Sequence, residues 1–187
     1  MVIGAGGGIG GHVAMRFASE GYHSVLCRRS NYKELDALVA KIQKGGNEAT
    51  GFILNAIEQN SIEECIERVE LNIGPIDTLI FNLGAQTGFK VLNETPNKTF
   101  ELAWRLATLS LFRTAASVLP FMEMRSNGNF LVTSATAAFR GNAGQAAHSS
   151  AMAGRRMLCQ TLNAEYAPKG IHIAHILIDG LVDAPDT

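Results

Sequence analysis

The sequence is poor in cysteine, proline and tryptophan, and each scarcity excludes a class of protein. Its 187 residues contain three cysteines, five prolines and one tryptophan. Three scattered thiols, with no CxxC pair, form neither a disulfide framework nor a zinc-ligand pattern, so we expect no metal site and a reducing, cytoplasmic location. No Pro- or Ser-rich linker, internal repeat or low-complexity stretch divides the chain.

The sequence also lacks a surplus of charge of either sign and a long hydrophobic run. The formal net charge is −1 at pH 7 and no local cluster of Lys or Arg reverses it, so we expect no nucleic-acid partner. No stretch reaches the roughly 20 apolar residues that span a bilayer, so we expect no membrane segment. With 47% hydrophobic residues, the chain can bury one core, which predicts a single globular domain over residues 1–187.

Strand-like and helix-like segments alternate along the chain. Amphipathic segments separate the apolar runs, and residues 96–124 have helical spacing throughout, which predicts one long helix. Alternation of this kind predicts an α/β fold of the Rossmann type, a doubly wound parallel sheet with helices on both faces and a short first strand. The apolar runs predict six strands, at Met1–Ile3, Ser24–Cys27, Ala49–Leu54, Thr78–Phe81, Asn129–Thr133 and Ile171–Ile178.

A glycine-rich turn follows the first strand and opens the first helix. The segment from Gly4 to Gly10 reads GAGGGIG, and a second register, GxGxxG, runs from Gly6 to Gly11. Glycines allow a sharp turn and a close approach of the backbone to a pyrophosphate, and the positive end of the following helix attracts the phosphates. This context predicts a dinucleotide site. The alternative is a turn that only packs the helix on the strand.

The end of the second strand indicates which dinucleotide is bound. An acidic residue about twenty positions beyond such a turn normally holds the ribose 2′-hydroxyl of NAD, but here Cys27 is followed by Arg28 and Arg29. A guanidinium can donate paired hydrogen bonds to a 2′-phosphate, and no carboxylate is present to repel that phosphate. The sequence therefore favours NADP(H) over NAD(H). The alternative is two solvated arginines at a strand end.

Three segments, the glycine turn, Asp77–Gly84 and Gly141–Met152, resemble in order the short-chain dehydrogenase/reductase family, and the resemblance spans nearly the whole chain. The turn matches the family motif TGxxxGIG except at Ile3, and Asn82 and Gly84 match the second half of its NNAG motif. Asn55 stands where the family has an Asp near the adenine. The resemblance, together with the two arginines, implies ten cofactor-binding residues, Gly4, Gly8, Ile9, Gly10, Arg28, Arg29, Asn55, Ala56, Asn82 and Gly84.

The positions that match the family's catalytic residues are all substituted. His148 stands at the tyrosine that donates a proton to the substrate carbonyl, and Met152 stands at the lysine that lowers the pKa of that tyrosine. Ala135 stands at the carbonyl-polarising serine and Ala107 at the helical asparagine. A positioned general acid contributes on the order of 10²–10⁴-fold to a rate. The resemblance is therefore to a tetrad-deficient member, catalytically reduced or non-enzymatic.

Three functions remain open at this point. The first is an NADP(H)-binding pseudoenzyme, a sensor or a partner subunit. The second is an active NADP(H)-dependent oxidoreductase of a small-molecule substrate with a non-standard proton donor such as His148, because imidazole titrates near neutral pH. The third is a structural protein without a dinucleotide, which the glycine turn disfavours.

The resemblance has two further implications for the whole molecule. Members of the family associate through long helices, so we expect a homo-oligomer, a dimer or a tetramer, through Pro96–Met124 and Gly144–Tyr166. The substrate-covering loop and last strand of the family have no counterpart in these 187 residues.

Overall fold

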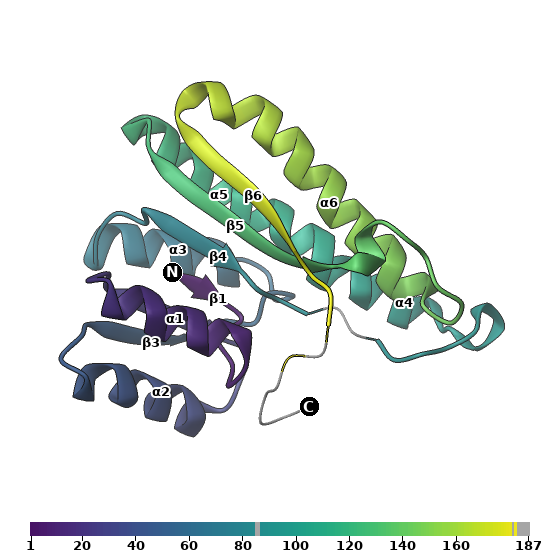
Figure 1. Cartoon of the computed structure of the whole chain (residues 1–187), viewed down its shortest axis with the longest axis horizontal. Helices are drawn as coiled ribbons and strands as arrows, with labels where there is room; N and C mark the ends of the chain where they lie inside the picture. Colours follow the sequence, from purple (N-terminus) through teal and green to yellow (C-terminus); the bar gives the residue numbers. More distant parts are fainter. Residues whose placement is uncertain (85–86, 181, 183–187) are drawn as a thin grey trace.

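Six parallel strands form one sheet in the order β3-β2-β1-β4-β5-β6 (Figure 1). The computed structural model describes residues 1–84, 87–180 and 182. All six predicted strands are present, each with its ends within two residues of the predicted positions, because buried apolar runs mark the strands of a parallel sheet. The strands are β1 (Val2–Ile3), β2 (Ser24–Arg28), β3 (Ala49–Ile53), β4 (Thr78–Phe81), β5 (Gly128–Ala135) and β6 (Ile171–Ile178).

Helices cover both faces of the sheet, as the sequence predicts. Successive strand residues point to opposite faces, so Val2 and Ile80 pack in a cluster with α1 and α2, whereas Ile3 and Phe81 pack in a cluster with α3, α5 and α6. The fold is therefore the doubly wound α/β fold. The helices are α1 (Ile9–Ser19), α2 (Tyr32–Lys44), α3 (Ser61–Asn72), α4 (Asn97–Trp104), α5 (Ser110–Arg125) and α6 (Ala146–Tyr166).

The single long helix predicted over residues 96–124 is present as one helical stretch, but its middle is not α-helical. A π-helical segment, Arg105–Leu109, separates α4 from α5 within an otherwise continuous helical stretch. The carbonyl of Ala107 accepts a hydrogen bond from Arg155 Nε at 3.1 Å, and the hydroxyl of Thr108 donates to the carbonyl of Ala151 at 2.9 Å. The bond from Arg155 occupies a backbone carbonyl of the segment and so competes with the regular helical ladder, which is a common cause of such interruptions.

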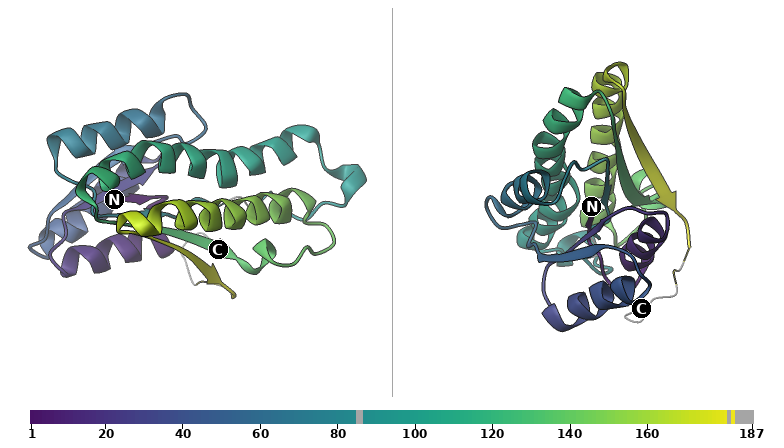
Figure 2. Two further views of the ribbon diagram at one scale, coloured as in Figure 1. Left: turned by 90° about the horizontal axis from the view of Figure 1, so that it is seen from above. Right: turned by 90° about the vertical axis from the view of Figure 1, so that its left-hand side faces the viewer.

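Helix α6 lies close against α4 (Figure 2). At Gly154 of α6 an added Cβ would stand 2.8 Å from the indole ring of Trp104, so only glycine leaves room for this ring. The close contact sets the position of the amino-terminal half of α6 relative to the end of β5.

In the described part of the chain, no helix is both long enough and apolar enough to cross a bilayer.

Candidate functional site

A cleft of about 930 Å³ opens at the carboxyl ends of the strands, where the chain leaves β1 and β4 in opposite directions. Ligands of open α/β sheets bind at such a switch point. The described residues that line the cleft include Arg29, His148 and Arg155, and no Asp or Glu is among them. The described lining of the cleft therefore carries the positive charges of Arg29 and Arg155 and no carboxylate. A smaller hollow, about 220 Å³, lies at the opposite ends of the strands.

The glycine turn forms the floor of this cleft. Gly4 has φ +96°, a conformation that side chains rarely adopt, and its amide donates to the carbonyl of Cys27 at 2.8 Å. A Cβ on Gly10 would stand 2.1 Å from the carbonyl oxygen of Gly4, whereas a Cβ on Gly6 would meet nothing within 4 Å. No side chain caps the amino end of α1, which begins at Ile9. The turn thus leaves an open cradle at a helix amino terminus, which fits a pyrophosphate.

Asn82 ties the turn to the neighbouring strands. Its Nδ2 donates to the carbonyl of Gly4 at 3.1 Å, and its Oδ1 accepts from the hydroxyl of Thr133 at 2.8 Å. The side chain therefore bridges the turn after β1 and the end of β5, and Gly84 lines the cleft two residues further on. The structure brings both residues of the predicted motif to the cleft.

Asn55 and Ala56 lie after β3 and are not among the residues that line the main cleft. The Nδ2 of Asn55 donates to Glu58 Oε1 at 2.8 Å, but its Oδ1 is buried and has no hydrogen-bond partner among the described residues. A buried acceptor without a partner is unfavourable unless a ligand supplies a donor. An exocyclic amino group such as that of adenine is a donor of this kind.

The two arginines after β2 have different environments. Arg28 forms an ion pair with Glu34 of α2, with 2.8 Å between Nη2 and Oε2, and its side chain is only 17% exposed. Arg29 is exposed and lines the cleft. Of the two arginines predicted to bind a 2′-phosphate, Arg29 lines the cleft and Arg28 is paired with Glu34.

The four positions that match the family's catalytic residues lie near one another, and three of them are apolar. Ala107, Ala135 and Met152 belong to one hydrophobic cluster made mostly of alanines. His148 lines the cleft beside Ser134, whose hydroxyl lies 3.9 Å from the sulfur of Met152. The cluster itself carries no group that can hold a proton or a charge.

Sequence reasoning missed Arg155, which lies one helical turn beyond Met152 on α6. Its side chain is fully buried, with 1% exposed, yet it lines the cleft. Its Nε, Nη1 and Nη2 donate to the carbonyls of Ala107, Thr133 and Leu83 at 3.1, 2.8 and 2.8 Å. The available signal was an arginine three residues after Met152, on the same face of the helix.

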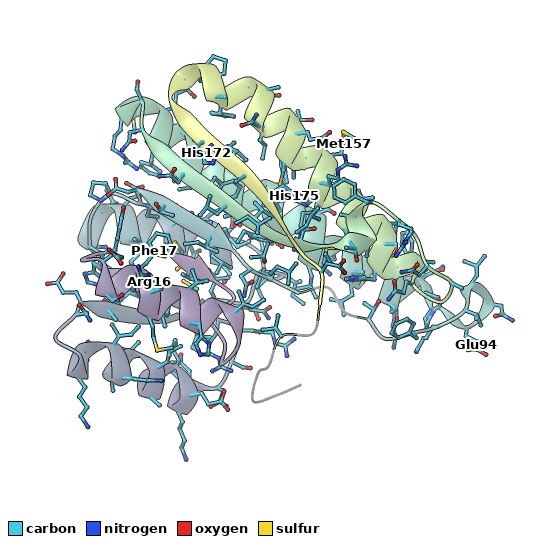
Figure 3. All side chains as sticks on the ribbon, in the orientation of Figure 1. Arg16, Phe17, Glu94, Met157, His172 and His175 are labelled. Carbon is cyan, nitrogen blue, oxygen red and sulfur yellow. The ribbon has the colours of Figure 1, made fainter. Side chains whose placement is uncertain are left out.

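Burial affects the ionisable groups around Arg155. Burial lowers the pKa of Arg155 to about 10, so the guanidinium remains charged at neutral pH. On β6, burial lowers the pKa of His175, and repulsion from Arg155 and Arg156 lowers it further. His175 lies three residues after His172 along this strand (Figure 3). Burial also raises the pKa of the Cys159 thiol to about 12, so this thiol is neutral.

Comparison with known proteins agrees with this fold and cleft. The family profile described as short chain dehydrogenase matches residues 1–185. A short-chain dehydrogenase from Rhodopseudomonas palustris superposes with a TM-score of 0.91 and 34% identity over 96% of this chain and 83% of that one. A 3-oxoacyl-(acyl-carrier-protein) reductase from Thermotoga maritima is 26% identical over 187 residues, 100% of this chain and 75% of the relative.

A variant of actinorhodin polyketide ketoreductase, solved with NADPH, has a TM-score of 0.91 and 25% identity over 99% of this chain and 71% of that one. The fold and the glycine cradle thus define a dinucleotide-binding α/β protein. The chain belongs to the short-chain dehydrogenase family, whose members are oxidoreductases that bind NAD(P).

Proposed function

We propose that this protein is a tetrad-deficient short-chain dehydrogenase that binds NADP(H) and does not catalyse ordinary carbonyl reduction. The observation that carries the proposal is a contrast within one cleft. The glycine turn keeps the open cradle of a dinucleotide site, whereas Ala107, Ala135 and Met152 form part of an alanine-rich apolar cluster.

The residues of this chain fit the cofactor along the length of the cleft. The turn from Gly4 to Gly10 would hold the pyrophosphate, with Gly8 and Ile9 at the start of α1. Arg29 would hold the 2′-phosphate. Asn55 lies outside the lining of the cleft, after β3, and its unpartnered Oδ1 would accept from the adenine amino group. Asn82 would flank the nicotinamide half. When bound, the nicotinamide supplies hydride chemistry to the cleft.

At three of the four positions that match the family's catalytic residues, this chain lacks the groups that would make this chemistry productive on a carbonyl. A carbonyl that accepts hydride needs a proton donor and a group that stabilises the developing oxyanion. The side chains of Ala107, Ala135 and Met152 provide neither. Dinucleotide binding without turnover fits a sensor or a partner subunit.

One observation supports an active enzyme as a second candidate. His148 lines the cleft together with Ser134, so an imidazole and a hydroxyl stand where a substrate would approach the nicotinamide. In this candidate His148 is the proton donor to a small-molecule substrate. The discriminating experiment is NADPH oxidation with a panel of ketones, enones and imines. Turnover that is lost in His148→Phe would favour this candidate.

The proposed dinucleotide preference is tested by titrating the protein with NADPH and NADH and following nicotinamide fluorescence. NADPH should bind more tightly than NADH. Arg29→Ala should weaken NADPH binding about 10- to 100-fold, the range expected for charge-assisted bonds to a phosphate, and should leave NADH binding unchanged.

Arg28→Ala is the matched control for this titration. Arg28 is paired with Glu34 and is not among the residues that line the cleft, so its loss should change NADPH affinity less than threefold, as estimated for a residue without a direct contact. Equal affinity of the wild-type protein for NADPH and NADH would contradict the NADP preference. Absence of binding to both would contradict dinucleotide binding itself.

A further inference from the structure

We infer that Arg155 makes the cleft selective for the reduced dinucleotide, so that the protein binds NADPH more tightly than NADP⁺. This inference rests on the proposed function, because it concerns the dinucleotide in the same cleft. It adds a residue that discriminates between two redox states of one ligand.

The charge on Arg155 is fixed in place by the backbone. Its three hydrogen bonds reach three separate segments, which are the turn after β4 at Leu83, the π-helical segment at Ala107 and the end of β5 at Thr133. The guanidinium carbon also lies 5.1 Å from the ring centroid of Phe81. A side chain held at so many points keeps its position whether or not a ligand is bound.

No negative group neutralises this charge among the described residues. The ion pairs formed there do not include Arg155, and its hydrogen-bond acceptors are all neutral carbonyls. The nearby thiol of Cys159 has a raised pKa and is uncharged at neutral pH. The inner end of the cleft therefore holds a positive charge whose hydrogen-bond partners are all uncharged.

This charge lies on the side of the cleft that would receive the nicotinamide. In a doubly wound sheet the pyrophosphate lies at the switch point and the adenosine half lies toward the end of β2, where Arg29 stands. The other half of the ligand must then extend over β4 and β5. The carbonyls of Leu83 and Thr133, which Arg155 binds, lie after β4 and at the end of β5.

The two redox states of the nicotinamide differ in charge at this end of the molecule. The oxidised ring carries a positive charge and the reduced ring is neutral, while the phosphates and the adenosine are the same in both. Like charges repel more strongly where burial reduces solvent screening, as it does for the buried Arg155, so the guanidinium raises the free energy of the oxidised complex alone. We expect NADPH to bind at least about tenfold more tightly than NADP⁺, which raises the two-electron potential of the bound couple by about 30 mV.

The test compares dissociation constants for NADPH and NADP⁺, measured by calorimetry, in the wild-type protein and in Arg155→Met and Arg155→Lys. The ratio of NADP⁺ to NADPH dissociation constants should be at least about 10 in the wild type. Arg155→Met should lower this ratio toward 1 by tightening NADP⁺ binding. Arg155→Lys, which keeps the charge, should retain most of the ratio.

Two controls separate this effect from damage to the site. Binding of 2′-phosphoadenosine diphosphate ribose, which lacks the nicotinamide, should be unchanged in Arg155→Met. Arg29→Ala should weaken NADPH and NADP⁺ binding equally and so leave the ratio unchanged.

A wild-type ratio near 1, or an unchanged ratio in Arg155→Met, would overturn the inference. A wild-type ratio near 1 would still overturn the inference if Arg155→Met fails to fold. Failure of both dinucleotides to bind would instead remove the proposed function on which the inference rests.

Discussion

Two glycines of the turn, Gly6 and Gly10, face different surroundings. A Cβ on Gly10 would overlap the carbonyl of Gly4 at 2.1 Å, a backbone atom that cannot move aside, whereas the space beside Gly6 is open. Packing therefore requires glycine at position 10. The open space beside Gly6 is where we propose that the pyrophosphate lies.

Alanine substitutions should separate these two roles. Gly10→Ala should lower the free energy of unfolding by at least about 2 kcal/mol, because the added methyl forces the backbone apart. Gly6→Ala should change the free energy of unfolding by less than about 0.5 kcal/mol, yet weaken NADPH binding at least about tenfold by filling the cradle. Urea unfolding and fluorescence titration measure the two quantities. Unchanged NADPH binding in Gly6→Ala would mean that the phosphates lie elsewhere.

The sequence predicts the role of a single residue when that role depends on its neighbours along the chain. The turn and Asn82 could be predicted because they directly follow strands β1 and β4, which the apolar runs identify. The sequence could not separate Arg28 from Arg29, since the difference depends on the position of Glu34 on another element. Arg155 was missed because its burial depends on three carbonyls distant in sequence.

Helix α5 supports the loop that carries Asn55 through a single side chain. Arg113 of α5 donates to both carboxylate oxygens of Glu63, at 2.8 and 2.6 Å, and to the carbonyls of Ala56 and Glu58 at 3.0 and 2.9 Å. The hydrogen bond from Arg113 lowers the pKa of Glu63. This clamp joins α3, α5 and the loop after β3 on the side of the site proposed for the adenine.

Removing the clamp should increase the mobility of the loop more than it lowers the stability of the whole fold. Arg113→Ala should lower the free energy of unfolding by about 1 kcal/mol, a modest value because Glu63 is 39% exposed and solvent screens the pair. Amide hydrogens of residues 57–60 should exchange faster. Arg16→Ala, which removes an exposed ion pair within α1, is the control and should change neither quantity. Unchanged exchange in the loop would show that Arg113 does not hold it.

The contribution of the clamp should also depend on pH in a definite direction. The pKa of Glu63 is lower in the folded protein than its ordinary value of 4.5, so the pair stabilises the fold above that value. The difference in stability between the wild type and Arg113→Ala should therefore shrink as the pH falls below about 4.5.

At the scale of elements, the strands follow from the sequence and the π-helical segment does not. A strand in a parallel sheet is buried on both faces and so appears as an apolar run, a purely local signal. The interruption at Arg105–Leu109 involves the bond from Arg155 of α6 to the carbonyl of Ala107, which only the packed structure supplies. The spacing of apolar residues alone predicts a regular α-helix across such a segment.

On the scale of the whole molecule, large apolar side chains are exposed along α4, the π-helical segment, α5 and α6. Homo-oligomerisation through these helices, which the resemblance implies, remains a prediction, and single exposed apolar residues need no partner. Several large ones on adjacent elements are typical of a subunit interface. The exposed residues are Phe100, Leu102, Trp104, Leu109, Phe112, Met124 and Met157.

Phe112→Glu should convert an oligomer into monomers. Phe112 is 54% exposed, so a charge there should leave the fold intact but oppose burial against a second copy of the chain. Leu71→Glu, at a residue of α3 that is 70% exposed, is the control and should leave the mass unchanged. Sedimentation equilibrium measures both masses. A monomeric wild-type protein at micromolar concentration would contradict the prediction.

The close contact between Gly154 and Trp104 has an optical consequence. Trp104 is the single tryptophan of the chain, and it is packed against the helix that carries Arg155. Its emission therefore reports one place in the molecule, without an added label. Reduced nicotinamide absorbs in the range where indole emits and the oxidised form does not, so energy transfer from Trp104 would reveal the redox state of the bound dinucleotide directly.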